Sequence, residues 1–173
     1  MSKSSTTIFI IDDDPMMQSM LKDHLSGMSN FTIHTFATGE EALASGQLVP
    51  DIVFLDYNLD SKIANAMDGI DVLREIKSKY PATEVVMLSG QDKIEVAVDT
   101  MKYGAFDYIV KGESAFYRAE KTVFNLFKLS QLKRNAGMYK VLTITFGVAF
   151  LIMIILVIIL ISKGMISDHV GWF

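Results

Sequence analysis

A stretch of 21 residues without a single charge, 141–161, limits the fold of this chain more than any other feature of its sequence. Eighteen of these residues are apolar, and 16 of them are Leu, Ile, Phe or Val. As a helix the stretch would reach about 31 Å, close to the hydrocarbon thickness of a bilayer. The 16 residues favour membrane insertion by roughly 0.3–0.6 kcal/mol each, or about 5–10 kcal/mol in total. A chain this small has no interior that could cover such a helix on all sides, so we expect one transmembrane helix.

The charges on either side of this stretch predict its orientation. Lys128, Lys133, Arg134 and Lys140 precede it, whereas only Lys163 follows it closely. Because cations are retained on the cytoplasmic side, we expect a single-pass membrane protein whose N-terminal part is cytoplasmic. The cations before the stretch could also contact anionic membrane lipid. The start of the chain, MSKSSTT and an apolar run of four residues, is too short to be a signal peptide.

Charge divides the chain into parts of different character. Residues 1–127 contain 11 Lys+Arg and 19 Asp+Glu, whereas residues 128–140 contain four cations and no anion. The net charge of −4 gives no basic surplus, so we expect no nucleic-acid partner. The absence of Cys excludes disulfides, thiolate metal sites and Cys nucleophiles. We expect four parts: a soluble domain (1–127), a basic juxtamembrane bridge (128–140), a transmembrane helix (141–161) and a short extracytoplasmic tail (162–173).

The soluble part alternates between short apolar runs and helical patterns. Apolar and β-branched runs of four to six residues predict strands covered on both faces, as in a parallel sheet. The expected strands are 7–11, 31–36, 51–56, 84–89 and 107–110, and the expected helices are 15–27, 39–45, 69–79, 94–103 and 114–135. Their alternation predicts an α/β fold with a five-stranded, doubly wound parallel sheet and right-handed crossovers. Gly137 either loosens the joint to the membrane helix or lies within one bent helix.

Polar side chains stand where the expected strands end. Asp12 and Asp13 follow the first strand, Asp56 ends the third, Ser89 ends the fourth and Lys111 follows the fifth. In an open parallel sheet, ligands bind at this edge. Three clustered carboxylates repel one another unless protons or a hard cation intervene, and Mg²⁺ prefers such oxygen ligands. A carboxylate beside the ion can attack phosphorus, while a lysine and a hydroxyl bind the phosphoryl oxygens.

Five segments between residues 6 and 127 carry a resemblance to a known family. They are IFIIDDDP (8–15), PDIVFLDYNL (50–59), MDGIDVLREIK (67–77), VVMLSG (85–90) and GAFDYIVKG (104–112). In these segments the chain resembles the receiver domains of two-component response regulators. The resemblance implies a flavodoxin-like sheet with strand order 2-1-3-4-5 and Mg²⁺ as cofactor. It also implies a phosphoacceptor signalling domain that is not an enzyme and takes its phosphoryl group from a histidine kinase or phosphotransfer protein.

The same resemblance implies the roles of individual residues. Asp56 would be the phosphoacceptor. The implied Mg²⁺ ligands are the carboxylates of Asp12, Asp13 and Asp56 and the backbone carbonyl of Asn58. The residues implied to bind or follow the phosphoryl group are Ser89, Lys111 and the switch aromatic Tyr108. Phosphorylation would shift the surface of the fourth helix, fifth strand and fifth helix, which could dock a partner or a second copy of the chain.

Two segments depart from the family pattern. Ten residues, YNLDSKIANA (57–66), separate Asp56 from the MDG turn, which is longer than usual, and the expected Pro is missing. Lys111 is followed by Gly112, where the family usually has a Pro with a cis bond. Because a cis bond without Pro would cost about 2.5–4 kcal/mol, we expect a trans bond. Neither departure removes a reactive group, so we expect phosphorylation to be retained.

Two other functions remain open. The first is a pseudo-receiver that acts as a membrane scaffold and is never phosphorylated. The second is a haloacid-dehalogenase-like phosphatase, for which Asp12, Asp13 and Asp14 supply carboxylates, although Met16 stands where its motif needs Thr or Val. We expect no DNA-binding or enzymatic output domain after residue 127, so the output would be docking at the membrane or storage of phosphoryl groups.

Overall fold

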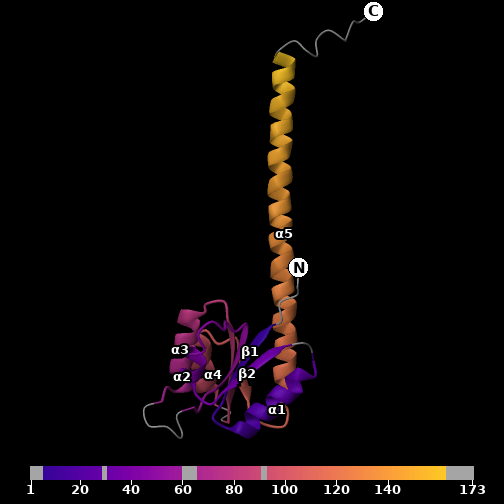
Figure 1. Cartoon of the computed structure of the whole chain (residues 1–173). Coiled ribbons are helices and arrows are strands. Elements are labelled where there is room, and N and C mark those ends of the chain that lie inside the picture. Colours follow the sequence, from indigo (N-terminus) through magenta and orange to yellow (C-terminus); the bar gives the residue numbers. More distant parts are fainter. Residues whose placement is uncertain (1–5, 29–30, 60–65, 91–92, 163–173) are drawn as a thin grey trace, which may run out of the picture. The chain divides into compact units, whose positions relative to one another are not determined.

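The structure of the protein, a computed structural model, describes residues 6–28, 31–59, 66–90 and 93–162 (Figure 1). Its contacts divide the chain into two units, Met1–Asn125 and Leu126–Phe173. The strands are β1 (Thr7–Ile11), β2 (Thr32–Phe36), β3 (Ile52–Asp56), β4 (Glu84–Ser89) and β5 (Asp107–Val110). The helices are α1 (Pro15–Ser26), α2 (Gly39–Leu43), α3 (Gly69–Lys79), α4 (Ile94–Lys102) and α5 (Ala115–Ser162).

The five strands form one parallel sheet in the order β2-β1-β3-β4-β5. Figure 1 shows α2, α3 and α4 on one side of the sheet and α1 on the other. The predicted α/β class, doubly wound sheet and strand order are therefore confirmed. The predicted helix 39–45 is shorter than expected, since α2 ends at Leu43.

Three helices that follow the carboxyl edge of the sheet, α1, α2 and α3, begin with side-chain caps. Asp14 Oδ1 accepts a hydrogen bond of 2.9 Å from the Met16 amide, and Pro15 occupies the first turn of α1. Thr38 Oγ1 likewise accepts from the Glu41 amide at 3.2 Å, and Asp68 Oδ1 accepts from the Asp71 amide at 2.8 Å. Such caps satisfy amides that the first helical turn leaves without partners. They fix the residues at which these three helices begin.

A hydrophobic core fills the space between the sheet and the helices α2 and α3. Phe9, Val53 and Met87 contribute from the strands, Ala42 from α2 and Leu73 from α3. β3 is buried along its whole length. An apolar interior therefore surrounds β3, and the polar side chains at the carboxyl edge begin where this interior ends.

The last helix, α5, runs without a break from Ala115 to Ser162. The predicted helix 114–135 continues beyond residue 135, and of the two alternatives for Gly137 the structure has the one in which it lies within a single helix. A glycine in a helix costs about 1 kcal/mol relative to alanine, which helical residues on both sides can offset. Within the second unit, Leu142–Ile161 has a mean hydropathy of 3.3, none of it is buried, and it is long enough to cross a membrane. The predicted tail, 162–173, lies outside the described residues except for Ser162.

Candidate functional site

Two neighbouring strands bring the predicted acidic residues together. Ile11 pairs with Leu55 in the register of β1 and β3, so the residues that follow, Asp12 and Asp56, lie side by side at the carboxyl edge. Asp12 is fully buried, and Asp56 is 3% exposed. One carboxylate oxygen from each of Asp12, Asp13 and Asp56 lies within 4.8 Å of the others. The three carboxylates thus form one acidic group.

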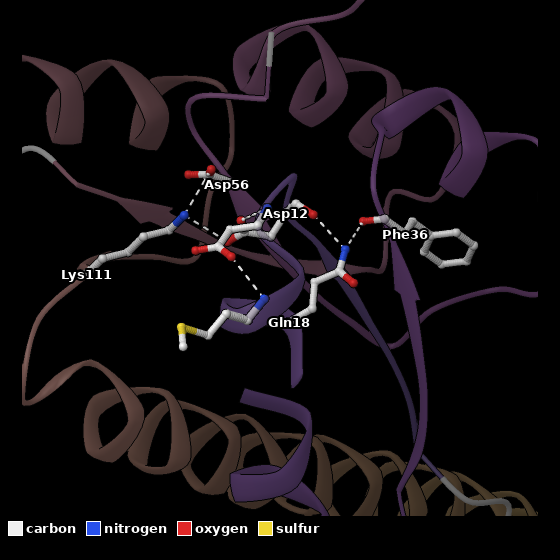
Figure 2. Close-up of polar contacts among 7 residues, drawn as sticks. Asp12, Gln18, Phe36, Asp56 and Lys111 are labelled. Carbon is white, nitrogen blue, oxygen red and sulfur yellow. Dashed lines mark hydrogen bonds and ion pairs between the residues drawn. The ribbon is translucent and has the colours of Figure 1, made fainter. Parts of the chain in front are cut away.

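Lys111 joins this acidic group from the loop after β5 (Figure 2). Its Nζ lies 2.8 Å from Asp12 Oδ2 and 2.9 Å from Asp56 Oδ2. The Lys111 backbone amide also donates to the Ser89 carbonyl at 2.7 Å, which continues the pairing of β4 with β5 by one residue. Counted as three carboxylates and one ammonium, the group has a formal charge of −2.

Burial and charge shift two pKa values in this cluster. Burial raises the pKa of Asp12 above its usual value, and the charge of Asp56 adds to this effect. Hydrogen bonds from Lys111 and the Asp14 amide oppose it only in part. For Lys111, burial alone would lower the pKa, but the interactions with Asp12 and Asp56 together raise it. Lys111 therefore remains a cation, and it does not fully compensate the carboxylates beside it.

The oxygen atoms at the site fit a divalent cation. Among the described residues, Asp56 Oδ1 is buried without a hydrogen bond, while Oδ2 of the same carboxylate binds Lys111. A buried carboxylate oxygen without a partner is unfavourable, and a proton, a water molecule or a hard cation can satisfy it. A charge of 2+ would also neutralise the local charge of −2. The donor set and its charge therefore match Mg²⁺, with Asp12, Asp13 and Asp56 as the carboxylates that would hold it.

The other predicted site residues lie along the same edge of the sheet or just below it. Ser89 is fully buried at the end of β4, one residue after Leu88, which pairs with Asp56. Tyr108 is 8% exposed on β5 and belongs to the hydrophobic core. Asn58 is half-buried, two residues after Asp56. The peptide bond between Lys111 and Gly112 is trans, as expected.

The sequence profile of the response regulator receiver domain matches residues 8–116. The chain belongs to this family. Receiver domains accept phosphoryl groups in two-component signalling, bind Mg²⁺ at an acidic pocket, and interact with histidine kinases or phosphotransfer proteins.

Curated relatives of this receiver domain are longer proteins. The DNA-binding transcriptional regulator NtrC of Salmonella typhimurium is 30% identical over 105 residues, which are 60% of this chain and 21% of NtrC. The probable C4-dicarboxylate response regulator DctR of Priestia megaterium is 30% identical over 115 residues, which are 64% of this chain and 47% of DctR. The matched region thus spans less than half of either relative.

Solved structures resemble this receiver domain in fold. The crystal structure of NtrX from Brucella abortus matches with a TM-score of 0.67 and 31% identity, over 77% of this chain and 30% of that chain. A CheY-like receiver domain from Methanospirillum hungatei matches with a TM-score of 0.63 and 24% identity, over 74% and 98% of the two chains. The second likeness shows the fold alone.

Two residues of this receiver domain that sequence reasoning did not assign to the site lie against it. Gln18 Nε2 donates to the Asp12 carbonyl at 2.6 Å and to the Phe36 carbonyl at 2.7 Å. Gly69 is the first residue of α3, as the predicted helix 69–79 has it, and it lies against the backbone of Asp56. A Cβ atom at Gly69 would approach the Asp56 carbonyl oxygen to 2.4 Å. In the sequence, the MDG turn indicates only that a helix begins here. It does not indicate how closely Gly69 approaches the end of β3.

The long connection after Asp56 is fixed at both ends. Leu59 is 3% exposed and packs in the hydrophobic core. At the other end, the Met67 amide donates to Glu40 Oε1 of α2 at 2.7 Å. Residues 60–65, the centre of the predicted long loop, lie outside the described residues.

Proposed function

We propose that this chain is a membrane-tethered receiver that accepts a phosphoryl group on Asp56 in the presence of Mg²⁺. The proposal depends above all on the Asp56 carboxylate. One of its oxygens is bound by Lys111, and the other is buried with no hydrogen bond from the part of the chain that the structure describes. This carboxylate lies within an acidic group whose net charge calls for a divalent cation. The group combines a nucleophile with the positive charge that phosphoryl transfer requires.

The reaction would join an Asp56 carboxylate oxygen to phosphorus while the bond from phosphorus to the donor breaks. The donor departs with the electron pair of that bond, and the product is an acyl phosphate on Asp56. Mg²⁺, when bound, would offset charge on the phosphoryl oxygens. Lys111, which already lies 2.9 Å from Asp56 Oδ2, would supply a second positive charge to these oxygens. Asp12 and Asp13 would hold the metal, together with the backbone carbonyl of Asn58.

The new phosphoryl group would act on the neighbouring strands. It carries a charge of roughly −2 and three acceptor oxygens. In this proposal the Ser89 hydroxyl turns toward the group, and Tyr108 turns into the space that Ser89 leaves. The surface of α4, β5 and the start of α5 then changes its packing, which alters docking of a partner or of a second copy. A histidine kinase or a phosphotransfer protein would donate the phosphoryl group.

The membrane part of the proposal is supported by composition and charge. Leu142–Ile161 is a helix of sufficient length and hydropathy to span a bilayer. Four cations and no anion lie in residues 128–140, which favours retention of this side in the cytoplasm. We infer a single-pass protein with residues 1–127 as a cytoplasmic receiver domain, 128–140 as its basic bridge and 162–173 on the opposite side.

Phosphorylation of the full-length protein in detergent tests the proposed chemistry. The wild type should take up one phosphoryl group from acetyl phosphate with Mg²⁺, measured by intact mass, and should take up none with a chelator present. Asp56→Asn should abolish uptake, because an amide cannot form the acyl phosphate. Asp23→Asn, on the exposed surface of α1, is the matched control and should behave as the wild type.

The alternatives give different outcomes in the same experiment. A pseudo-receiver would take up no phosphoryl group in any variant. A phosphatase of the haloacid-dehalogenase type would carry the group on Asp12, so Asp56→Asn would still be modified. Either outcome would contradict the proposed function.

A further inference from the structure

Gln18 connects two strands at the edge of the sheet that carries the acidic group (Figure 2). It is the fourth residue of α1 and is half-buried. Its Nε2 donates to the carbonyl of Asp12 at 2.6 Å and to the carbonyl of Phe36 at 2.7 Å. An amide nitrogen has two hydrogens, so both are used. A single side chain therefore fixes the carboxyl ends of β1 and β2 to each other.

These two carbonyls lie where backbone pairing between the strands ends. The Asp12 amide donates to the Phe36 carbonyl at 3.1 Å, one residue beyond the register of β1 with β2. The Asp12 carbonyl lies one step further, in the connection to α1. The Gln18 side chain thus provides a hydrogen-bond donor for the Asp12 carbonyl, which lies beyond the last backbone pairing of β1 with β2.

The peptide that Gln18 holds is the one that joins Asp12 to Asp13. Because a peptide unit is planar, fixing its carbonyl also fixes the direction in which the chain enters Asp13. The Asp12 side chain is held separately, since its Oδ1 accepts a hydrogen bond of 3.0 Å from the Asp14 amide. The Asp12 carboxylate is therefore oriented before any ligand arrives, and so is the backbone from which the Asp13 side chain projects.

We propose that Gln18 is a positioning residue that orients the Asp12–Asp13 peptide so that the acidic group binds Mg²⁺ in a preformed arrangement. This inference rests on the proposed function, which supplies the metal. Groups that orient ligands without touching the metal commonly contribute about 10- to 100-fold to metal affinity. Gln18 acts through the peptide and contacts no reacting atom, so its effect should fall on Mg²⁺ affinity more than on the rate with Mg²⁺ bound.

The test measures Mg²⁺ binding to the full-length protein in detergent by isothermal titration calorimetry. Gln18→Met keeps the length of the side chain and removes both donors, so we expect the Kd for Mg²⁺ to rise about 10-fold. Gln18→Asn is shorter by one methylene and adds neither bulk nor charge. It should lose at least one of the two hydrogen bonds and have a smaller effect. Ser19→Ala, at the neighbouring exposed position of α1, is the control and should leave the Kd unchanged.

Phosphorylation by acetyl phosphate provides a second readout. In Gln18→Met the Mg²⁺ concentration for half-maximal rate should rise with the Kd, while the rate at saturating Mg²⁺ stays within about threefold of the wild type. If both Gln18 variants unfold at lower temperature yet keep the wild-type Kd, the residue is structural only, and the inference is wrong. Gln18→Asn decides the question if Gln18→Met does not fold. Failure of the wild type itself to bind Mg²⁺ would overturn the proposed function and this inference together.

Discussion

Lys111 offsets part of the negative charge at the acidic site. Its side chain is 23% exposed and reaches Asp12 and Asp56, whose side chains are 0% and 4% exposed. Lys111→Met keeps the apolar stem and leaves buried carboxylates without their cation. We expect the free energy of unfolding without Mg²⁺ to fall by about 3 kcal/mol, as for a broken buried ion pair. Urea unfolding of the full-length protein in detergent measures this change.

Added Mg²⁺ should reverse part of this loss. The Lys111→Met variant has more uncompensated negative charge at the site, so Mg²⁺ should stabilise it more than it stabilises the wild type. Lys102→Met is the matched control, because Lys102 pairs with Asp99 at 2.9 Å on the surface of α4. Its stability should remain almost unchanged. Equal effects of the two substitutions would show that the buried ion pairs of Lys111 are not important for stability.

At the level of elements, the start of α3 lies against the end of β3. A Cβ atom at Gly69 would lie 2.4 Å from the Asp56 carbonyl oxygen and 2.7 Å from that of Tyr57. Both are backbone atoms, so Gly69→Ala must move either α3 or the end of β3. We expect a loss of about 1–3 kcal/mol in unfolding free energy, as is typical of overpacking, and slower phosphorylation of Asp56.

Gly27→Ala is the matched control for this substitution. Gly27 follows α1 as its C-cap with φ −70°, and among the described residues a Cβ atom there would meet the His24 carbonyl oxygen at an ordinary 3.5 Å. Alanine fits this conformation, so it should be neutral or stabilise the protein by about 0.4–1 kcal/mol. Comparable destabilisation by both alanines would contradict the close packing of α3 on β3.

The accuracy of the sequence predictions differs between kinds of element for physical reasons. Strands were predicted within one residue because buried strands of a parallel sheet are continuous apolar runs, as in IVFLD of β3. Asp12, Asp56 and Lys111 could be brought together because parallel strands end at a common edge. Gln18 could not, because a polar residue on a helix gives no local sign that its amide reaches two strand ends. The length of α5 was underestimated because its charged first part and its uncharged second part have different sequence patterns and were predicted as separate helices. The backbone is helical through both parts.

At the scale of the whole molecule, the proposed membrane-spanning helix, residues 142–161, predicts that charged substitutions within it release the protein from a membrane. The apolar block contributes about 5–10 kcal/mol to insertion, and each Arg at the centre of a span costs about 2.5–3.5 kcal/mol. Three substitutions, Leu151→Arg, Ile154→Arg and Ile158→Arg, should therefore cancel most of the insertion energy. After alkaline carbonate extraction of cell membranes, the wild type should remain in the pellet and the triple variant should appear in the supernatant.

A triple variant with valine at the same three positions is the control for this experiment. Valine keeps the block uncharged and apolar, so the protein should stay in the pellet. Acetyl phosphate should modify Asp56 at similar rates in all three purified proteins, because the acidic site lies in the other compact unit of the chain. Release of the wild type by carbonate would show that 142–161 does not span the bilayer. The protein would then be associated with the membrane peripherally and not through a spanning helix, whereas the proposed phosphorylation of Asp56 would be unaffected.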